Sequence, residues 1–219
     1  MQQYCCYGGI TTGCNQSDET DNEFNWSIPL ESNNPIINNR IGNIGFKFCL
    51  LNEDSISANV FKKDKNFYFY FTIENFSEEE ITIDGKSFST NLFLIYDGEQ
   101  GNLIGKPYSG HFCLFSGEPL LVSIKGKESK VIILAWIADY GERWPEVYNN
   151  LYINTVNKSY PYCCGQENPL LSKGIHSCRF GIDLQYRIGG KTRDEYGFII
   201  DGIEKIIKEL FFEINFKIE

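Results

Sequence analysis

A strict alternation of side-chain character in the middle of the chain constrains its fold more than any other feature. Between Asn66 and Phe76, aromatic and β-branched residues recur at every second position. A strand directs successive side chains to opposite faces, so this spacing predicts a strand with one buried face. The expected buried face carries Phe67, Phe69, Phe71 and Ile73, and the opposite face carries Tyr68, Tyr70, Thr72 and Glu74.

The same alternation returns at the C-terminus, where apolar residues fill every second position from Leu210 to Ile218. Helix signals are scarce: Ile203, Ile206, Ile207 and Leu210 have helical spacing, but the run is too brief to distinguish from the start of a strand. Further short apolar runs are bounded by Gly, Pro, Asn and Asp, which form turns. The chain is therefore expected to hold strands at 44–51, 66–76, 81–84, 91–96, 120–124, 130–138, 177–188 and 209–218.

Short strands at this spacing favour a β-sandwich or barrel over an α/β architecture. We expect one all-β sandwich domain over residues 41–219, a length sufficient to bury a core without help from disulfides. Residues 1–40 are polar and rich in Asn. They are interpreted as a disordered tether followed by an irregular lead-in.

The charge balance excludes two classes of partner. The formal net charge is −9 and the isoelectric point is about 4.9, whereas nucleic-acid-binding proteins usually carry a basic stripe. An acidic protein is also poorly suited to anionic membrane surfaces, and no run approaches the roughly 18 apolar residues that span a bilayer. We therefore predict no nucleic-acid partner and no transmembrane segment.

The N-terminal residues contain a candidate lipidation site. Thr11-Thr12-Gly13-Cys14, followed by the polar run 15–22, resembles the end of a bacterial lipoprotein signal, in which the cysteine is lipidated. Residues 1–13 lack Lys and Arg, however, and do not form a convincing signal peptide. A disordered tail with an incidental cysteine is an equal alternative. The lipoprotein interpretation predicts a lipid anchor at Cys14 and a bacterial cell-envelope location, and an unprocessed Met1 would instead predict the cytoplasm.

The chain has 8 cysteines, an even number that permits disulfides in an exported protein. Connectivity cannot be derived from the sequence. A bond from Cys163 or Cys164 to Cys178 would join the long segment before residue 177 to the strand that follows it. Alternatively, cysteines in apolar runs, such as Cys49 and Cys113, are buried free thiols that act as small hydrophobic groups.

The segment from Phe46 to Gly126 carries a family resemblance. The strand Phe67–Ile73 runs into Asn75, and a second strand, Leu92–Asp97, is followed by a Gly turn and by Pro107-Tyr108. This pattern resembles the immunoglobulin-like domains of bacterial envelope lipoproteins and, more faintly, the bacterial intracellular proteinase inhibitor family. The resemblance implies an immunoglobulin-like antiparallel sandwich and a cell-envelope address. No inhibitory loop aligns with these residues, and a fold alone does not fix a function.

Patterns typical of catalysis are weak. His176 and Cys178 are two residues apart, which places them on one face of a strand, but such a pair is more typical of a histidine beside a disulfide cysteine. Asp139, Glu142 and Glu146 would supply carboxylates for glycoside hydrolysis, yet acidic residues in loops are usually only solvated. No Cys-x2-Cys pair is present, which disfavours structural zinc. We predict no metal, no cofactor and no enzyme activity.

The longest stretch without strand signals, 139–176, is rich in aromatic residues, and long loops are often functional. Exposed Trp and Tyr rings stack on sugars or anchor protein partners, or else they cover an open edge of the core. We expect a non-enzymatic binding or adhesion module that recognises a glycan or a protein through the 139–170 loop. The candidate binding residues are Tyr140, Trp144, Tyr148, Tyr152, Tyr160 and Tyr162.

Other functions stay open. The same loop would serve a small hydrolase or a thiol-dependent enzyme. A structural assembly subunit would pair through the alternating strand 209–218, and the weaker resemblance implies a proteinase-inhibitor-like domain. The oligomeric state is not predicted.

Overall fold

The structure is a computed structural model of the chain, and it describes residues 24–84, 92–107, 121–136, 170–189 and 201–219. Within these residues every regular element is a strand, which confirms the all-β prediction. The elements are β1 (Phe24–Ile28), β2 (Ile36–Ile41), β3 (Ile44–Leu51), β4 (Val60–Phe61), β5 (Phe67–Asn75), β6 (Ile81–Asp84), β7 (Leu94–Asp97), β8 (Leu103–Gly105), β9 (Leu121–Ile124), β10 (Ser129–Trp136), β11 (Gly174–Ile188) and β12 (Ile203–Ile218).

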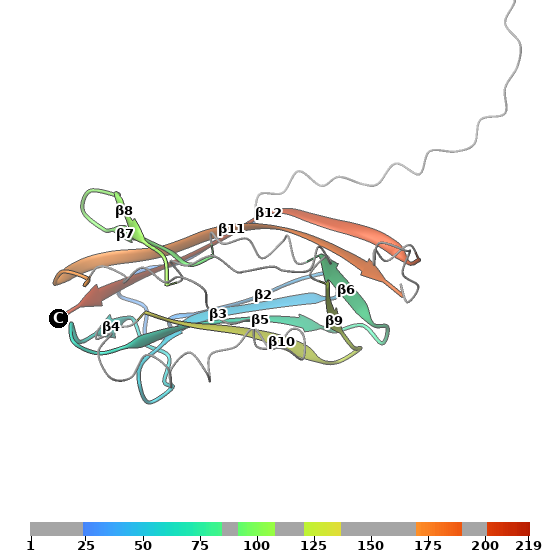
Figure 1. The fold of residues 1–219 in the computed structure, drawn as a ribbon, viewed down its shortest axis with the longest axis horizontal. Coiled ribbons are helices and arrows are strands. Elements are labelled where there is room, and N and C mark those ends of the chain that lie inside the picture. Colours follow the sequence, from blue (N-terminus) through green and yellow to red (C-terminus); the bar gives the residue numbers. More distant parts are fainter. Residues whose placement is uncertain (1–23, 85–91, 108–120, 137–169, 190–200) are drawn as a thin grey trace, which may run out of the picture.

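The strands form two sheets that lie one above the other (Figure 1). The small sheet has the strand order β10-β5-β3-β2 and is antiparallel throughout. The large sheet has the order β1-β12-β11-β6-β9, with β4 paired to β12 and the β7–β8 hairpin paired to β11. Two of its pairs, β1 with β12 and β4 with β12, are parallel, so the fully antiparallel sandwich that we expected is corrected for this sheet.

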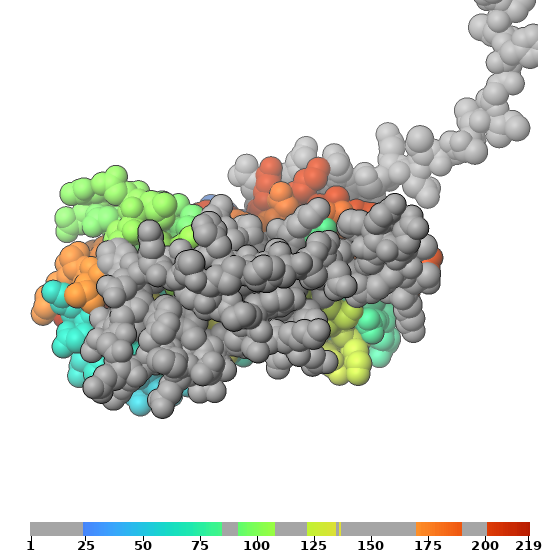
Figure 2. All heavy atoms as spheres, viewed as in Figure 1, coloured from blue at the N-terminus to red at the C-terminus, as the bar shows by residue number. Residues whose placement is uncertain are grey.

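The long strand β11 organises the large sheet. Its N-terminal part, His176–Arg179, pairs with β7, and its C-terminal part, Tyr186–Ile188, pairs with β6. Its other edge pairs with β12 along nearly its whole length. The β7–β8 hairpin therefore joins the sheet near one end of β11 and stands out from the molecule there (green in Figure 2).

The core lies between the inner faces of the two sheets and is built mainly from phenylalanine rings. Phe180 and Phe212 of the large sheet stack with their centroids 4.8 Å apart. Phe48 of the small sheet meets Phe180 edge to face at 5.0 Å, a favoured geometry for aromatic pairs. The predicted inward face of β5 is confirmed, because Phe67, Phe69, Phe71 and Ile73 are all at most 2% exposed.

Two strands lie where an irregular lead-in was predicted, so that interpretation is wrong for 24–28 and 36–41. In β1, Phe24, Trp26 and Ile28 alternate with polar residues and pack against the core. The Trp26 ring lies 5.0 Å from Phe212. The alternation in β1 is only five residues long, and pairing with β12 supplies the backbone hydrogen bonds that such a short strand needs.

The open choice between helix and strand after residue 202 is decided in favour of strand. β12 begins at Ile203, opposite Ile188 of β11. The register between the two strands shifts between Ile182 and Leu184. The extra residue of β12 lies between Ile207 and Leu210 and buries both of them on the inner face, which explains their helix-like spacing of three.

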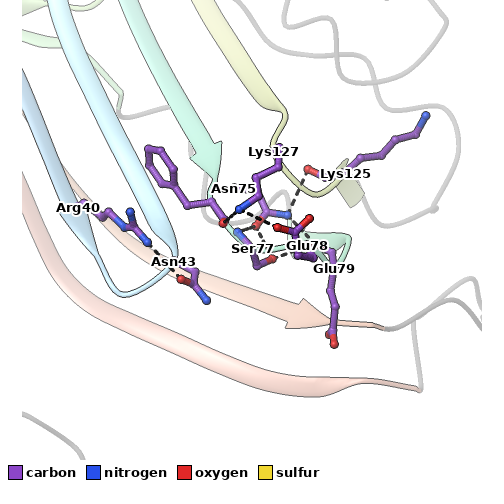
Figure 3. A network of polar contacts seen from close by, with 9 residues as sticks. Arg40, Asn43, Asn75, Ser77, Glu78, Glu79, Lys125 and Lys127 are labelled. Carbon is purple, nitrogen blue, oxygen red and sulfur yellow. Dashed lines mark hydrogen bonds and ion pairs between the residues drawn. The ribbon is translucent and has the colours of Figure 1, made fainter.

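A buried asparagine ties two turns, β5–β6 and β9–β10, together at one end of the sandwich (Figure 3). Asn75 is 0% exposed, and its Nδ2 donates to the carbonyls of Glu79 at 2.7 Å, Ile124 at 3.1 Å and Lys125 at 3.2 Å. Its Oδ1 accepts from the backbone N–H of Ser77 at 3.0 Å and from the Ser77 hydroxyl at 2.6 Å. The side chain thereby satisfies carbonyls that would otherwise lose their hydrogen bonds to water.

None of the described segments forms a helix that is long and apolar enough to cross a membrane.

Candidate functional site

Most of the residues selected from the sequence lie outside the described residues. This holds for Cys14, for Cys163 and Cys164, and for all six aromatic residues of the 139–170 loop. Their assignments as lipidation site, disulfide partners and ligand-binding residues stay predictions. The Ig-like connectivity, the cell-envelope location and the absence of enzyme activity are likewise untested.

Cys178 is described, and the disulfide expected there is not formed. It is a free thiol, 0% exposed on the inner face of β11. Burial, followed by the charge of Glu213, raises the pKa of this thiol well above its ordinary range. The group therefore stays protonated and behaves as a small apolar side chain.

His176 shares the inner face with Cys178, as the two-residue spacing predicted. The ring is 1% exposed, packs 5.5 Å from the Phe216 ring, and its Nε2 lies 2.8 Å from the carbonyl oxygen of Ser172. That contact assigns the proton to Nε2, because a carbonyl only accepts. The pair therefore lacks an activated thiolate and is part of the core.

The described residues instead bring a polar cluster together on the outer face of the large sheet. Strand pairing places Ser27 of β1, Glu213 of β12 and Arg179 of β11 side by side in one row. The neighbouring row contains Tyr96 of β7, Ser177 of β11 and Asn215 of β12. Directly paired residues point to the same face of a sheet. We call these six residues the outer-face patch.

Electrostatic contacts hold the first row in place. Nε of Arg179 lies 2.6 Å from Oε1 of Glu213, and the Ser27 hydroxyl donates to Oε2 at 3.3 Å. The Nε contact is ionic, because the N–H direction does not make a hydrogen bond. The side chains of Arg179 and Glu213 are 36% and 20% exposed, so water screens the pair less than it screens a fully exposed one.

The second row adds an aromatic ring and unused polar atoms. The guanidinium of Arg179 lies 5.0 Å from the centre of the Tyr96 ring, a cation–π contact. Asn215 donates to the carbonyl of Ile28 at 3.4 Å. The Ser177 hydroxyl is buried and has no hydrogen-bond partner among the described residues. A buried hydroxyl without a partner costs free energy, and a bound water or ligand would offset that cost.

The patch combines guanidinium N–H donors, carboxylate and amide oxygens, and a tyrosine on a rigid sheet. Arg179 and Glu213 neutralise each other, so the patch suits a neutral polar ligand better than a charged one. It contains one carboxylate, that of Glu213, and no cysteine. Among the described residues, no group of three His, Cys, Asp or Glu side chains is placed to hold a metal ion.

Sequence reasoning missed the patch because its members come from four strands. Arg179 and Glu213 stand at outward positions of two predicted strands, and that signal was present in the sequence. The register that puts them opposite each other, and the pairing of β7 with β11, follow only from the tertiary structure.

No protein-family model, curated protein or solved structure matches the chain. The geometry of the chain itself is therefore the basis for a functional proposal.

Proposed function

We propose that the protein is a non-enzymatic binding module that holds a neutral glycan on its outer-face patch. The observation that carries the proposal is the Tyr96–Arg179–Glu213 arrangement, in which an aromatic ring adjoins a partly exposed ion pair. Sugar hydroxyls both donate and accept hydrogen bonds, and a carboxylate next to a guanidinium offers both functions at neighbouring points. Tyrosine supplies the apolar surface that packs against sugar C–H groups.

The rigidity of the support favours binding over chemistry. All four contributing strands belong to one sheet: β12 pairs with both β1 and β11, and β7 pairs with β11. Side chains on paired strands lose little further freedom when a ligand binds, which lowers the entropic cost of association. The 139–170 loop remains a second candidate contact region, on the strength of its sequence alone.

The test uses a panel of immobilised neutral oligosaccharides and the full chain. We expect selective binding by the wild-type protein and a loss of about tenfold or more for Arg179→Ala, because hydrogen bonds to charged groups contribute about 1.5–3 kcal/mol. Arg187→Ala is the matched control. Arg187 lies on the outer face of the same strand and pairs with Glu204 at 2.5 Å, outside the patch, so its loss should leave glycan binding unchanged.

Three outcomes oppose the proposal. Absence of glycan binding by the wild-type chain would reject the ligand class. Equal losses for Arg179→Ala and Arg187→Ala would indicate a general effect on the sheet. Loss of binding on Trp144→Ala but not on Arg179→Ala would move the site to the loop.

A further inference from the structure

Beside the outer-face patch, the large sheet carries a third row of outward side chains. Ile175 of β11 lies opposite Lys217 of β12, and Lys217 lies opposite Val60 of β4. Ile175 stands two residues before Ser177 of the second row, which puts both side chains on the same face of the sheet. Ile175 is 43% exposed, Val60 is 45% exposed and the Lys217 side chain is 44% exposed. The third row therefore offers a ligand aliphatic surface on both sides of an ammonium group.

The β7–β8 hairpin adds apolar surface next to the third row. Leu103 of β8 pairs with Tyr96 of the second row and is 57% exposed. The Ile175 side chain lies against the hairpin as well, because a Cβ built on Gly98 would lie only 2.8 Å from Ile175 Cγ2. In the register of β7 with β11, Tyr96 stands between the row of Arg179 and the row of Ile175. Tyr96 therefore joins the polar surface of the patch to an apolar surface.

Hydrogen bonds fix the turn of this hairpin. Oδ1 of Asp97 accepts from the backbone N–H of Glu99 at 2.9 Å and from that of Gln100 at 2.7 Å. The N–H of Gly98 donates to the carbonyl of Ile175 at 2.9 Å, which ties the turn to β11. The apolar side chains of the hairpin are therefore held in place before a ligand binds, which lowers the entropic cost of association.

We propose that the third row is a subsite for the acetamido group of an N-acetylated neutral sugar. The proposal rests on the glycan-binding function proposed above and names the class of sugar. The methyl of the acetamido group packs on Ile175 and the Tyr96 ring, and its carbonyl accepts a hydrogen bond from Nζ of Lys217. Ile175 and Arg179 lie roughly 13 Å apart along β11, so a short oligosaccharide reaches both the third row and the Arg179–Glu213 pair.

Lys217 is able to donate to a ligand and keep its contact within the chain. Its Nζ lies 2.7 Å from a carboxylate oxygen of Glu219, and an ammonium group has three N–H donors. The ion pair also leaves the third row close to neutral, as the Arg179–Glu213 pair does for the patch. An acidic sugar would meet a carboxylate in both rows, so a neutral sugar with a carbonyl acceptor is favoured.

The other neutral sugars fit the third row less well. An unmodified hexose offers hydroxyl groups to Lys217 but no apolar group to Ile175. A deoxy sugar with a terminal methyl group offers the apolar contact but no carbonyl acceptor beside it. An acetamido group supplies a methyl and a carbonyl on one carbon, and Ile175 and Lys217 are direct neighbours across β11 and β12.

The test compares matched pairs of neutral oligosaccharides by isothermal titration calorimetry with the full chain. Chitotriose and cellotriose share ring type and linkage, and they differ in carrying an acetamido or a hydroxyl group at the same carbon. N-acetyllactosamine and lactose form a second such pair. We expect the wild type to bind the acetamido member about tenfold or more tightly, because it adds a methyl contact and a hydrogen bond to a charged donor.

Two substitutions test the two contacts separately. Ile175→Ser removes the aliphatic surface, and Lys217→Met removes the donor but keeps the length of the side chain. Each should weaken binding of the acetamido member by about fivefold or more and that of the hydroxyl member by much less. The remaining affinity for the hydroxyl member shows that the variant is folded. Ile206→Ser and Lys205→Met make the same changes near the other end of β12 and should leave the preference unchanged.

The outcomes distinguish this subsite from the proposed function. Equal affinity for the two members of each pair, with glycan binding that still depends on Arg179, would overturn the subsite and leave glycan binding standing. A preference that survives both Ile175→Ser and Lys217→Met would place acetamido recognition elsewhere and would also overturn it. Absence of binding to every neutral oligosaccharide would reject the proposed function and the subsite together.

Discussion

At the scale of single residues, the buried side chain of Asn75 forms hydrogen bonds to four backbone groups, three carbonyls and one N–H. One carboxamide donates to carbonyls of the β5–β6 turn and of the end of β9, and its oxygen accepts from Ser77 of the same β5–β6 turn. Lys127 reinforces the same region by donating to the Phe76 carbonyl at 2.7 Å and pairing with Glu78 at 3.0 Å. The lysine contacts are exposed and contribute little, whereas the asparagine contacts are buried.

We predict that Asn75→Ala lowers the free energy of unfolding by about 3 kcal/mol, because it leaves buried carbonyls without donors. Lys127→Ala should lower it by less than about 1 kcal/mol. Both values come from urea denaturation followed by tryptophan fluorescence. Similar losses for the two variants would contradict the assignment of Asn75 as the main connection between the turns.

At the scale of elements, a glycine inside strand β11 and a glycine in the β9–β10 turn differ in the space around them. Gly181 is in the middle of the strand opposite Phe211, and a Cβ added there would meet only the Leu210 carbonyl oxygen, at 3.7 Å. Gly126, in the turn before β10, is different. A Cβ there would lie 2.3 Å from the backbone oxygen of Glu78, which is too close for any side chain.

Gly181→Ala should therefore raise the free energy of unfolding by about 0.5–1 kcal/mol, since it reduces the flexibility of the unfolded chain at a position with room for a methyl group. Gly126→Ala should lower it by about 2 kcal/mol or more, because backbone must move. Paired urea denaturation curves measure both. A destabilised Gly181→Ala protein would show that the outer face near Phe211 is more crowded than the structure indicates.

At the scale of the whole molecule, folding raises the pKa values of one cysteine and two tyrosines. Burial raises the pKa of Cys49 from 9.0 to about 11, with a smaller opposing effect of Lys47. Burial likewise raises the pKa of Tyr68, with Glu53 adding to the shift, and that of Tyr186. In each case folding favours the protonated form.

The folded state therefore binds more protons than the unfolded state above about pH 9, and stability must fall as the pH rises from 9 towards 11. The stability that Cys49 contributes is fully present below its unfolded-state pKa of 9.0. It is lost as the pH rises through the folded-state pKa of about 11. Cys49→Ala should make the decline shallower. Denaturation midpoints at pH 8, 9, 10 and 11, taken to bracket these two pKa values, give the measurement, and an unchanged slope for Cys49→Ala would contradict the shift.

The sequence determined the parts of this protein that depend on local periodicity. The alternation in β5 and in the C-terminal half of β12 identified the strands and their inward phenylalanines, because only a strand places every second side chain on the same face. β3 and β6 were predicted at their observed bounds. The short alternation in β1 was too brief to recognise, and the start of β12 was ambiguous because a bulge interrupts its two-residue period between Ile207 and Leu210.

Only the tertiary structure decided which strands are neighbours, and with that the candidate site. The parallel pairing of β1 with β12 joins residues near opposite ends of the chain, and no local pattern encodes it. The same is true of the row from Ser27 through Glu213 to Arg179, and of the burial that keeps Cys178 a protonated thiol. The two-residue period determines which face of a strand is buried. Strand order and register depend instead on how strands far apart in the sequence pack against one another in the assembled core.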